Sequence, residues 1–155
     1  MTANNPVKQL EVLVGDDELA SPISWIEIRR CYFKLLQERL ASYCEVKIKE
    51  ASKPEQVIRE AQTGKYDIIV TDLDYQTEGR VGTEGYKVLD AIADMTFAKK
   101  PLVILCTSSD SQQETIRRKL KEGKMDLYIG SRGMNHKFAN LVNYLVERFG
   151  GETIK

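Results

Sequence analysis

Five short apolar segments recur along the chain, and stretches with the periodicity of amphipathic helices separate them. This alternation constrains the fold more than any other feature of the sequence. Three of the segments are almost continuously hydrophobic, as expected for parallel strands that are buried on both faces of a sheet. The five predicted strands are Leu10 to Val14, Val46 to Ile48, Ile68 to Val70, Leu102 to Cys106 and Leu127 to Ile129.

The segments between these strands carry apolar residues three or four positions apart, which is typical of one face of a helix. The clearest sets are Ile26, Phe33, Leu36 and Leu40, then Val57 with Ala61, Tyr86 with Leu89, and Leu141 with Leu145. A further helix is expected after Ser111, where only Ile116 and Leu120 are apolar, so it is the least well anchored. The pattern predicts a (βα)5 fold, a doubly wound parallel five-stranded sheet with helices on both faces.

Composition limits the kind of protein that this chain forms. Its 155 residues are 42% hydrophobic, which suits one domain with one sizeable core. Lys plus Arg and Asp plus Glu number 23 each, so no net charge favours nucleic acid or an anionic membrane. The longest apolar run is far below the roughly 20 residues of a transmembrane helix. We expect a single cytoplasmic domain over residues 1–155, with a core at about 9–149, that binds neither nucleic acid nor membrane.

Other site chemistries are disfavoured by the residues that the chain lacks. Cys31, Cys44 and Cys106 are an odd number of cysteines without CxxC spacing, which indicates buried thiols rather than disulfides or a zinc site. His136 is the only histidine, so a histidine-rich metal site is excluded.

Polar side chains follow the strands at the points where each strand ends. In doubly wound parallel sheets, ligands bind outside the carboxyl ends of the strands, at the switch point of the strand order. Neighbouring carboxylates repel unless a cation lies among them, and an all-oxygen site suits Mg²⁺. A neighbouring hydroxyl adds a donor for a phosphoryl oxygen, so the pattern favours phosphoryl transfer to a carboxylate. The polar residues are Asp16, Asp17, Asp72, Asp74, Thr107, Ser108, Ser131 and Arg132.

The segments VGDDE (14–18), IIVTD (68–72), VILCTSS (103–109) and DLYIG (126–130) resemble, in order and spacing, the receiver domain of bacterial response regulators. The resemblance covers roughly residues 9–149 and implies the flavodoxin-like receiver fold. It further implies that Asp72 accepts a phosphoryl group from a histidine kinase or a histidine phosphotransfer protein. By the same resemblance, Mg²⁺ is bound by Asp17, Asp72 and the backbone carbonyl of Asp74, with Asp16 acting through water. Thr107 would hold the phosphoryl group, and Tyr128 would be the aromatic switch residue.

The sequence departs from this family after the fifth strand, where Ser131 and Arg132 replace the usual Lys-Pro pair. In the family that lysine balances negative charge during transfer, and Arg132 is the candidate substitute. The stretches 18–25 and 75–82 are longer than such units need and are interpreted as insertions.

The sequence therefore predicts a stand-alone phosphorylated switch rather than an enzyme, with at most self-phosphorylation from a donor and autodephosphorylation. No output domain is expected, so signalling would occur by contact between a downstream protein and the surface around Tyr128 and the helix after Ser111. One alternative is a pseudo-receiver that binds partners without being phosphorylated, because the usual lysine is absent. Another is a haloacid-dehalogenase-like phosphatase, because DLDYQT (72–77) resembles the DxDxT motif of that family. The order of the acids along the chain counts against the phosphatase.

Overall fold

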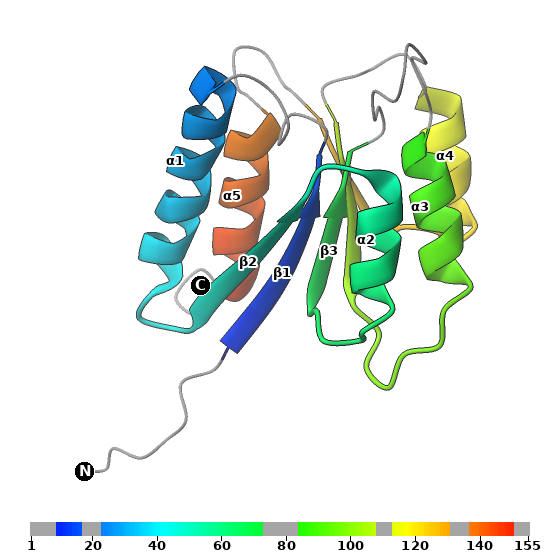
Figure 1. The fold of residues 1–155 in the computed structure, drawn as a ribbon, viewed down its shortest axis with the longest axis horizontal. Helices are drawn as coiled ribbons and strands as arrows, with labels where there is room; N and C mark the ends of the chain where they lie inside the picture. Colours follow the sequence, from blue (N-terminus) through cyan, green and yellow to red (C-terminus); the bar gives the residue numbers. More distant parts are fainter. Residues whose placement is uncertain (1–8, 17–22, 73–83, 108–112, 131–136, 151–155) are drawn as a thin grey trace.

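The computed structural model describes residues 9–16, 23–72, 84–107, 113–130 and 137–150, except for several side chains at the start of the first helix and the first side chain of the third and of the fourth helix. Strands and helices alternate through these residues (Figure 1). The strands are β1 (Gln9–Gly15), β2 (Glu45–Ala51), β3 (Ile68–Thr71), β4 (Leu102–Cys106) and β5 (Leu127–Ile129). The helices are α1 (Ile23–Leu40), α2 (Pro54–Ala61), α3 (Glu84–Ala93), α4 (Gln113–Lys121) and α5 (Lys137–Phe149). The predicted (βα)5 order is confirmed.

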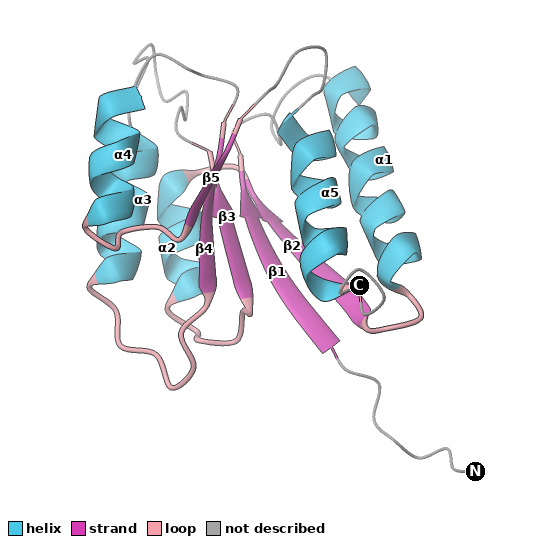
Figure 2. Ribbon diagram, turned by 180° about the vertical axis from the view of Figure 1, so that it is seen from behind, coloured by secondary structure: helices cyan, strands magenta, loops and turns pink. Residues whose placement is uncertain are grey.

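The five strands form one parallel sheet in the order β2-β1-β3-β4-β5. Helices α1 and α5 cover one face, and α2, α3 and α4 cover the other (Figures 1 and 2). The chain winds outward from β1 in one direction to β2 and then in the other through β3 to β5. The switch point between these directions lies where β1 and β3 are neighbours, and their carboxyl ends meet at one edge of the sheet.

Alternating strand residues divide the core into two layers. Val12 and Val14 face the layer under α1 and α5, whereas Leu13 faces the layer under α2, α3 and α4. The central strands are apolar at almost every position because both of their faces are buried. Phe33 of α1 and Phe138 of α5 meet edge to face at 5.4 Å between ring centroids, which joins the two helices over the first layer.

Two short sequences, GKYD (64–67) and GKMD (123–126), form the same connection before β3 and β5. Gly64 and Gly123 adopt φ values of 73° and 78°, in the left-handed region that favours glycine. The aspartate at the end of each sequence makes two hydrogen bonds with one residue of a neighbouring strand. Its N–H donates to the carbonyl of that residue, and its carboxylate accepts the N–H of the same residue. Asp67 does this to Glu11, and Asp126 does it to Val103, at 2.8 to 2.9 Å.

Helix α4 is held by few apolar contacts, as the sequence predicted. Ile116 is buried, but Leu120 is 36% exposed. A lysine provides the other anchor, because Lys119 Nζ lies 2.9 Å from Asp90 Oδ1 of α3 and 5.6 Å from the ring centroid of Tyr86. This ion pair therefore supplements the single buried contact of Ile116 in holding α4.

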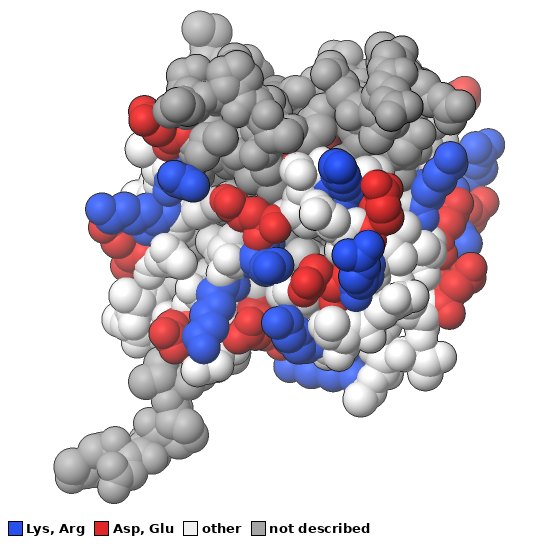
Figure 3. All heavy atoms as spheres, in the orientation of Figure 1, with Lys and Arg blue, Asp and Glu red and all other residues white. Residues whose placement is uncertain are grey.

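The charged residues are interspersed on the face shown in Figure 3, where basic and acidic side chains alternate without a large patch of one sign. Within the described residues, no helix has the length and hydropathy needed to cross a membrane.

Candidate functional site at the switch point of the sheet

The candidate site lies at the carboxyl ends of β1, β3 and β4. Asp16 follows β1, Asp72 follows β3 and Thr107 follows β4, so the sheet brings these three predicted residues to one edge. All three side chains are buried. Burial of two carboxylates is costly unless they are paired with a positive charge, so an aspartate pair at this position requires a cation nearby.

Backbone hydrogen bonds fix where each of these residues leaves its strand. The N–H of Asp16 donates to the Ala51 carbonyl at 3.0 Å, and the N–H of Asp72 donates to the Gly15 carbonyl at 2.9 Å. The N–H of Thr107 donates to the Ile129 carbonyl at 3.0 Å. The three residues thus continue the hydrogen-bonding ladder of the parallel sheet.

Lys137 supplies the cation between the two aspartates. Its Nζ donates to Asp16 Oδ2 at 2.6 Å and lies 3.5 Å from Asp72 Oδ1. The side chain is 1% exposed, although lysine is rarely found so deeply buried. This residue begins α5, so its ammonium enters the site from the helix rather than from the end of β5.

The protonation state of Lys137 follows from two opposing effects. Burial disfavours the charged form and would lower the pKa of Lys137, but the carboxylates of Asp16 and Asp72 favour it more strongly. Their combined effect holds the pKa of Lys137 above its ordinary value. Lys137 is therefore an ammonium at neutral pH, and it lies between the side chains of Asp16 and Asp72.

The backbone around Lys137 is tied to the neighbouring strands. The thiol of Cys106 donates to the Lys137 carbonyl at 3.8 Å, and the ammonium lies 5.1 Å from the centroid of the Phe138 ring. The Asn140 side-chain amide donates to the Gly130 carbonyl at 2.7 Å, which joins the first turn of α5 to the end of β5. These contacts fix the helix start that carries the ammonium.

Tyr128 lies on β5 beside the site. It is half-buried and packs on the layer of core under α2, α3 and α4. A methyl group on Gly130 would meet the Tyr128 hydroxyl at 2.6 Å and the Thr107 carbonyl oxygen at 3.5 Å. The absence of a side chain at Gly130 thus permits the present rotamer of Tyr128, in which its hydroxyl is folded back toward the end of the strand.

Several predicted site residues lie outside the described part of the chain. These are Asp17, Asp74, Ser131 and Arg132, together with insertion 75–82 and most of insertion 18–25. Among the described residues, no group of three potential metal ligands occurs.

Sequence reasoning missed Lys137, although the sequence contained a signal for it. Lys137 precedes Leu141 and Leu145 by four and eight positions, so it lies on the buried face of the predicted helix. A lysine on an apolar face requires a buried partner, and the aspartates at the strand ends were the candidates. The sequence instead pointed to Arg132, which follows the fifth strand closely in the chain, as the candidate substitute for the usual lysine.

Comparison with protein-family profiles gave no match to this chain, and comparison with curated protein sequences gave none either. Solved structures do match. The chemotaxis response regulator CheY4 of Vibrio cholerae superposes with a TM-score of 0.60 at 18% identity, covering 92% of this chain and 99% of that one. The chain has the receiver fold. The predicted flavodoxin-like receiver architecture is therefore confirmed.

Two further receiver structures match over similar lengths. The receiver domain of a sensor histidine kinase of Pseudomonas aeruginosa, solved with magnesium in its active-site cleft, has a TM-score of 0.58 at 15% identity, covering 92% of this chain and 98% of that one. The receiver domain of the response regulator Ssk1 of Saccharomyces cerevisiae, solved with the histidine phosphotransfer protein Ypd1, has a TM-score of 0.56 at 16% identity, covering 97% and 95%. At these identities the likeness establishes the fold.

Proposed function

We propose that this protein is a receiver switch that accepts a phosphoryl group on Asp72 from a phosphohistidine donor and signals by protein contact. The observation that carries the proposal is the buried ammonium of Lys137, 2.6 Å from Asp16 and 3.5 Å from Asp72. A helix cap or a turn would account for one aspartate after a strand, but not for two buried aspartates sharing a lysine at the switch point of a receiver fold.

The chemistry assigned to Asp72 is a displacement at phosphorus. One carboxylate oxygen forms the new O–P bond while the N–P bond of the phosphohistidine breaks, and the leaving imidazole nitrogen keeps the electron pair and takes up a proton. Charge on the transferring group is spread over three oxygens, so catalysis depends on positioned positive charge and donors. Lys137 supplies the charge, and the Thr107 hydroxyl supplies a donor from the neighbouring strand.

The residues present fit Mg²⁺. Two buried carboxylates against one ammonium leave net negative charge, and carboxylate oxygens are ligands that Mg²⁺ prefers. Asp72, with Asp17 and the Asp74 carbonyl, would hold the ion, and Asp16 would act on it through water. When bound, Mg²⁺ would neutralise negative charge on the transferring phosphoryl group.

The partners follow from the same proposal. A histidine kinase or a histidine phosphotransfer protein would supply the phosphoryl group, as the yeast receiver solved with Ypd1 illustrates for that protein. A downstream protein would bind the surface formed by α4 and the end of β5. The half-buried Tyr128 and the weakly anchored α4 are the elements there that can change position.

A pseudo-receiver remains the second candidate, because one contact favours it. Lys137 is 0.9 Å closer to Asp16 than to Asp72, since the two distances are 2.6 and 3.5 Å, and it already satisfies much of the charge at the site. A resident ammonium of this kind would stabilise the fold without any phosphoryl group. The phosphatase alternative has less support, because the acids follow β1 and β3 in the order of a receiver rather than of that enzyme family.

Intact mass spectrometry after incubation with acetyl phosphate and Mg²⁺ separates the two candidates. The proposal predicts a mass increase of one phosphoryl group that requires Mg²⁺ and is absent in Asp72→Asn. An unmodified wild-type protein at saturating donor and Mg²⁺ would support the pseudo-receiver.

A further inference from the structure

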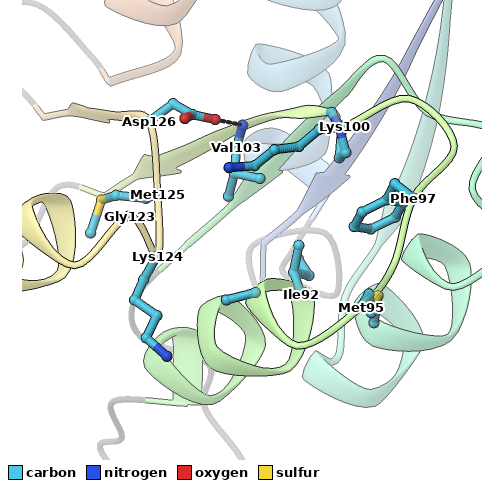
Figure 4. A pocket seen from close by; sticks show the side chains of 11 residues that line it. Ile92, Met95, Phe97, Lys100, Val103, Gly123, Lys124, Met125 and Asp126 are labelled. Carbon is cyan, nitrogen blue, oxygen red and sulfur yellow. Dashed lines mark hydrogen bonds between the residues drawn. The ribbon is translucent and has the colours of Figure 1, made fainter.

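A cavity of about 300 Å³ opens at the amino ends of β4 and β5, at the opposite edge of the sheet from Asp72 (Figure 4). The end of α3, the segment between α3 and β4, and the GKMD connection before β5 form its walls. This volume is at the lower end of the range for small-molecule sites in proteins. The site proposed above uses none of the residues that line the cavity.

The walls of the cavity are mostly apolar. Ile92, Val103 and Met125 are buried, and Met95 and Phe97 are half-buried on the segment between α3 and β4. Figure 4 shows these side chains arranged around one recess. The two methionines are flexible and polarisable, so they can adapt to an irregular apolar guest. A contiguous apolar recess on a charged surface is typical of a binding site.

The polar groups at the cavity favour a negative charge on the guest. Two basic residues, Lys100 and Lys124, and one acid, Asp126, line the cavity. The Asp126 Oδ2 already accepts the N–H of Val103 at 2.9 Å. Lys124 lies 3.8 Å from Asp90 on α3 and is thus partly neutralised. Lys100 forms no ion pair with any residue that the structure describes, and its side chain extends along the recess toward Val103 (Figure 4).

We propose that this cavity binds a small amphipathic monoanion, with its apolar body between Met95, Phe97 and Met125 and its anionic group on Lys100. Lys100 is the lining cation that pairs with no described residue, so it sets the charge of the guest. The volume limits its apolar body to that of a small carboxylic acid rather than a long lipid chain. The guest would contact β4 and β5 at the ends opposite to those followed by Thr107 and Gly130.

Methionine methyl groups provide the test, because Met95 and Met125 line the cavity whereas Met1 precedes β1 and Met134 lies between β5 and α5. The protein labelled with ¹³C at the methionine methyls is titrated with octanoate and, separately, with neutral octan-1-ol. We expect saturable shifts of Met95 and Met125, with Met1 and Met134 nearly unchanged. Filling the recess by Ala93→Trp, at an exposed position that lines it, should abolish these shifts.

The charge is tested with two adjacent lysines. Lys100→Gln should weaken octanoate binding about three- to fivefold, as expected for a solvent-exposed ion pair, and should leave octan-1-ol binding unchanged. Lys99→Gln is the matched control, because Lys99 is 85% exposed and pairs with Asp67 instead of lining the cavity. Absence of saturable shifts at Met95 and Met125, equal shifts at all four methionines, or equal effects of the two lysine variants would overturn the proposal.

Discussion

Lys137 and Asp16 form a fully buried ion pair, 2.6 Å between Nζ and Oδ2, that joins the start of α5 to the end of β1 across 121 residues of sequence. Under the proposed function, Lys137 would supply the positive charge that the resemblance to receiver domains led us to expect directly after β5. The pair also places the ammonium within 3.5 Å of Asp72, so the structural pair and the proposed phosphoacceptor share one cation. Stability and phosphorylation are therefore expected to depend on the same side chain.

The first prediction concerns stability. Lys137→Met leaves two carboxylates buried without their cation, so the free energy of unfolding should fall by about 3 kcal/mol without Mg²⁺. Millimolar Mg²⁺ should recover part of this loss by binding only the folded state. Urea unfolding with and without Mg²⁺ measures both effects. Lys99→Met, at an exposed lysine, is the control, and an equal loss in both variants would refute the role of Lys137.

The second prediction compares the two candidates for the cation in phosphorylation. Lys137→Gln should slow labelling by acetyl phosphate by about tenfold or more, because an ammonium beside the transferring group is removed. Arg132→Gln should change the rate little, since Lys137 already occupies the position between the acids. The two rates are measured by intact mass over time. A greater effect of Arg132→Gln would restore Arg132 as the substitute for the usual lysine.

The third prediction concerns pH. The Tyr66 hydroxyl donates to Glu60 Oε1 at 2.6 Å; burial and this bond raise the pKa of Tyr66 above its ordinary value of 10.0. The folded protein then keeps a proton that the unfolded chain loses. The stabilisation is thus fully present below pH 10 and is lost as pH rises toward the folded value. The same bond lowers the pKa of Glu60 below 4.5, and that contribution is lost as pH falls through the folded value.

Unfolding free energies of wild type and Tyr66→Phe across pH test this pair. The difference between the two proteins should be constant near neutral pH and should shrink above about pH 10 and below about pH 4.5. A difference that stays constant over the whole range would mean that the hydroxyl contributes only by packing.

The fourth prediction concerns Gly130 and Tyr128. Gly130→Ala should displace the Tyr128 ring, because the new methyl group would lie 2.6 Å from its hydroxyl. Tyr128→Phe removes the closest atom, so the alanine should cost less in that background, with a coupling energy of about 1 kcal/mol. A double-mutant cycle by urea unfolding measures the coupling, and a crystal structure of Gly130→Ala locates the ring. Zero coupling with an unmoved ring would contradict the assigned contact.

The ion pair that holds α4 gives the fifth prediction. Lys119→Met should increase amide hydrogen exchange in α4 about fivefold, the equivalent of roughly 1 kcal/mol for a partly exposed pair. Lys121→Met, at an exposed lysine of the same helix, should leave exchange nearly unchanged. Equal exchange in the two variants would show that Ile116 alone anchors the helix.

The sequence predicted strand bounds best where the strand consists of apolar residues alone. The bounds of β4 and β5 agree with the apolar segments Leu102 to Cys106 and Leu127 to Ile129. The edge strand β2 extends over Glu45–Ala51, beyond the predicted Val46 to Ile48, because its exposed positions are charged. Charged residues such as Lys47 and Lys49 are tolerated in an edge strand that faces solvent, so hydrophobicity alone underestimates the length of such strands.

The site was predictable only in part. The proximity of Asp16, Asp72 and Thr107 was predictable because a parallel sheet brings the carboxyl ends of its strands together, which topology alone determines. The spacing of Lys137 from Leu141 indicated its burial, but its contact with Asp16 depends on how α5 packs, which no local pattern specifies. A buried lysine on an apolar helix face is the kind of local conflict that marks a functional site.

The central claim is that Asp72 accepts the phosphoryl group, and chemical mapping tests it most directly. The protein is incubated with acetyl phosphate and Mg²⁺ and then treated with borohydride, which reduces an acyl phosphate of aspartate to homoserine, and its peptides are sequenced by mass spectrometry. We predict homoserine at position 72 alone, with none in Asp72→Asn. Homoserine at Asp16 or at another acid, or labelling that survives in Asp72→Asn, would contradict the account.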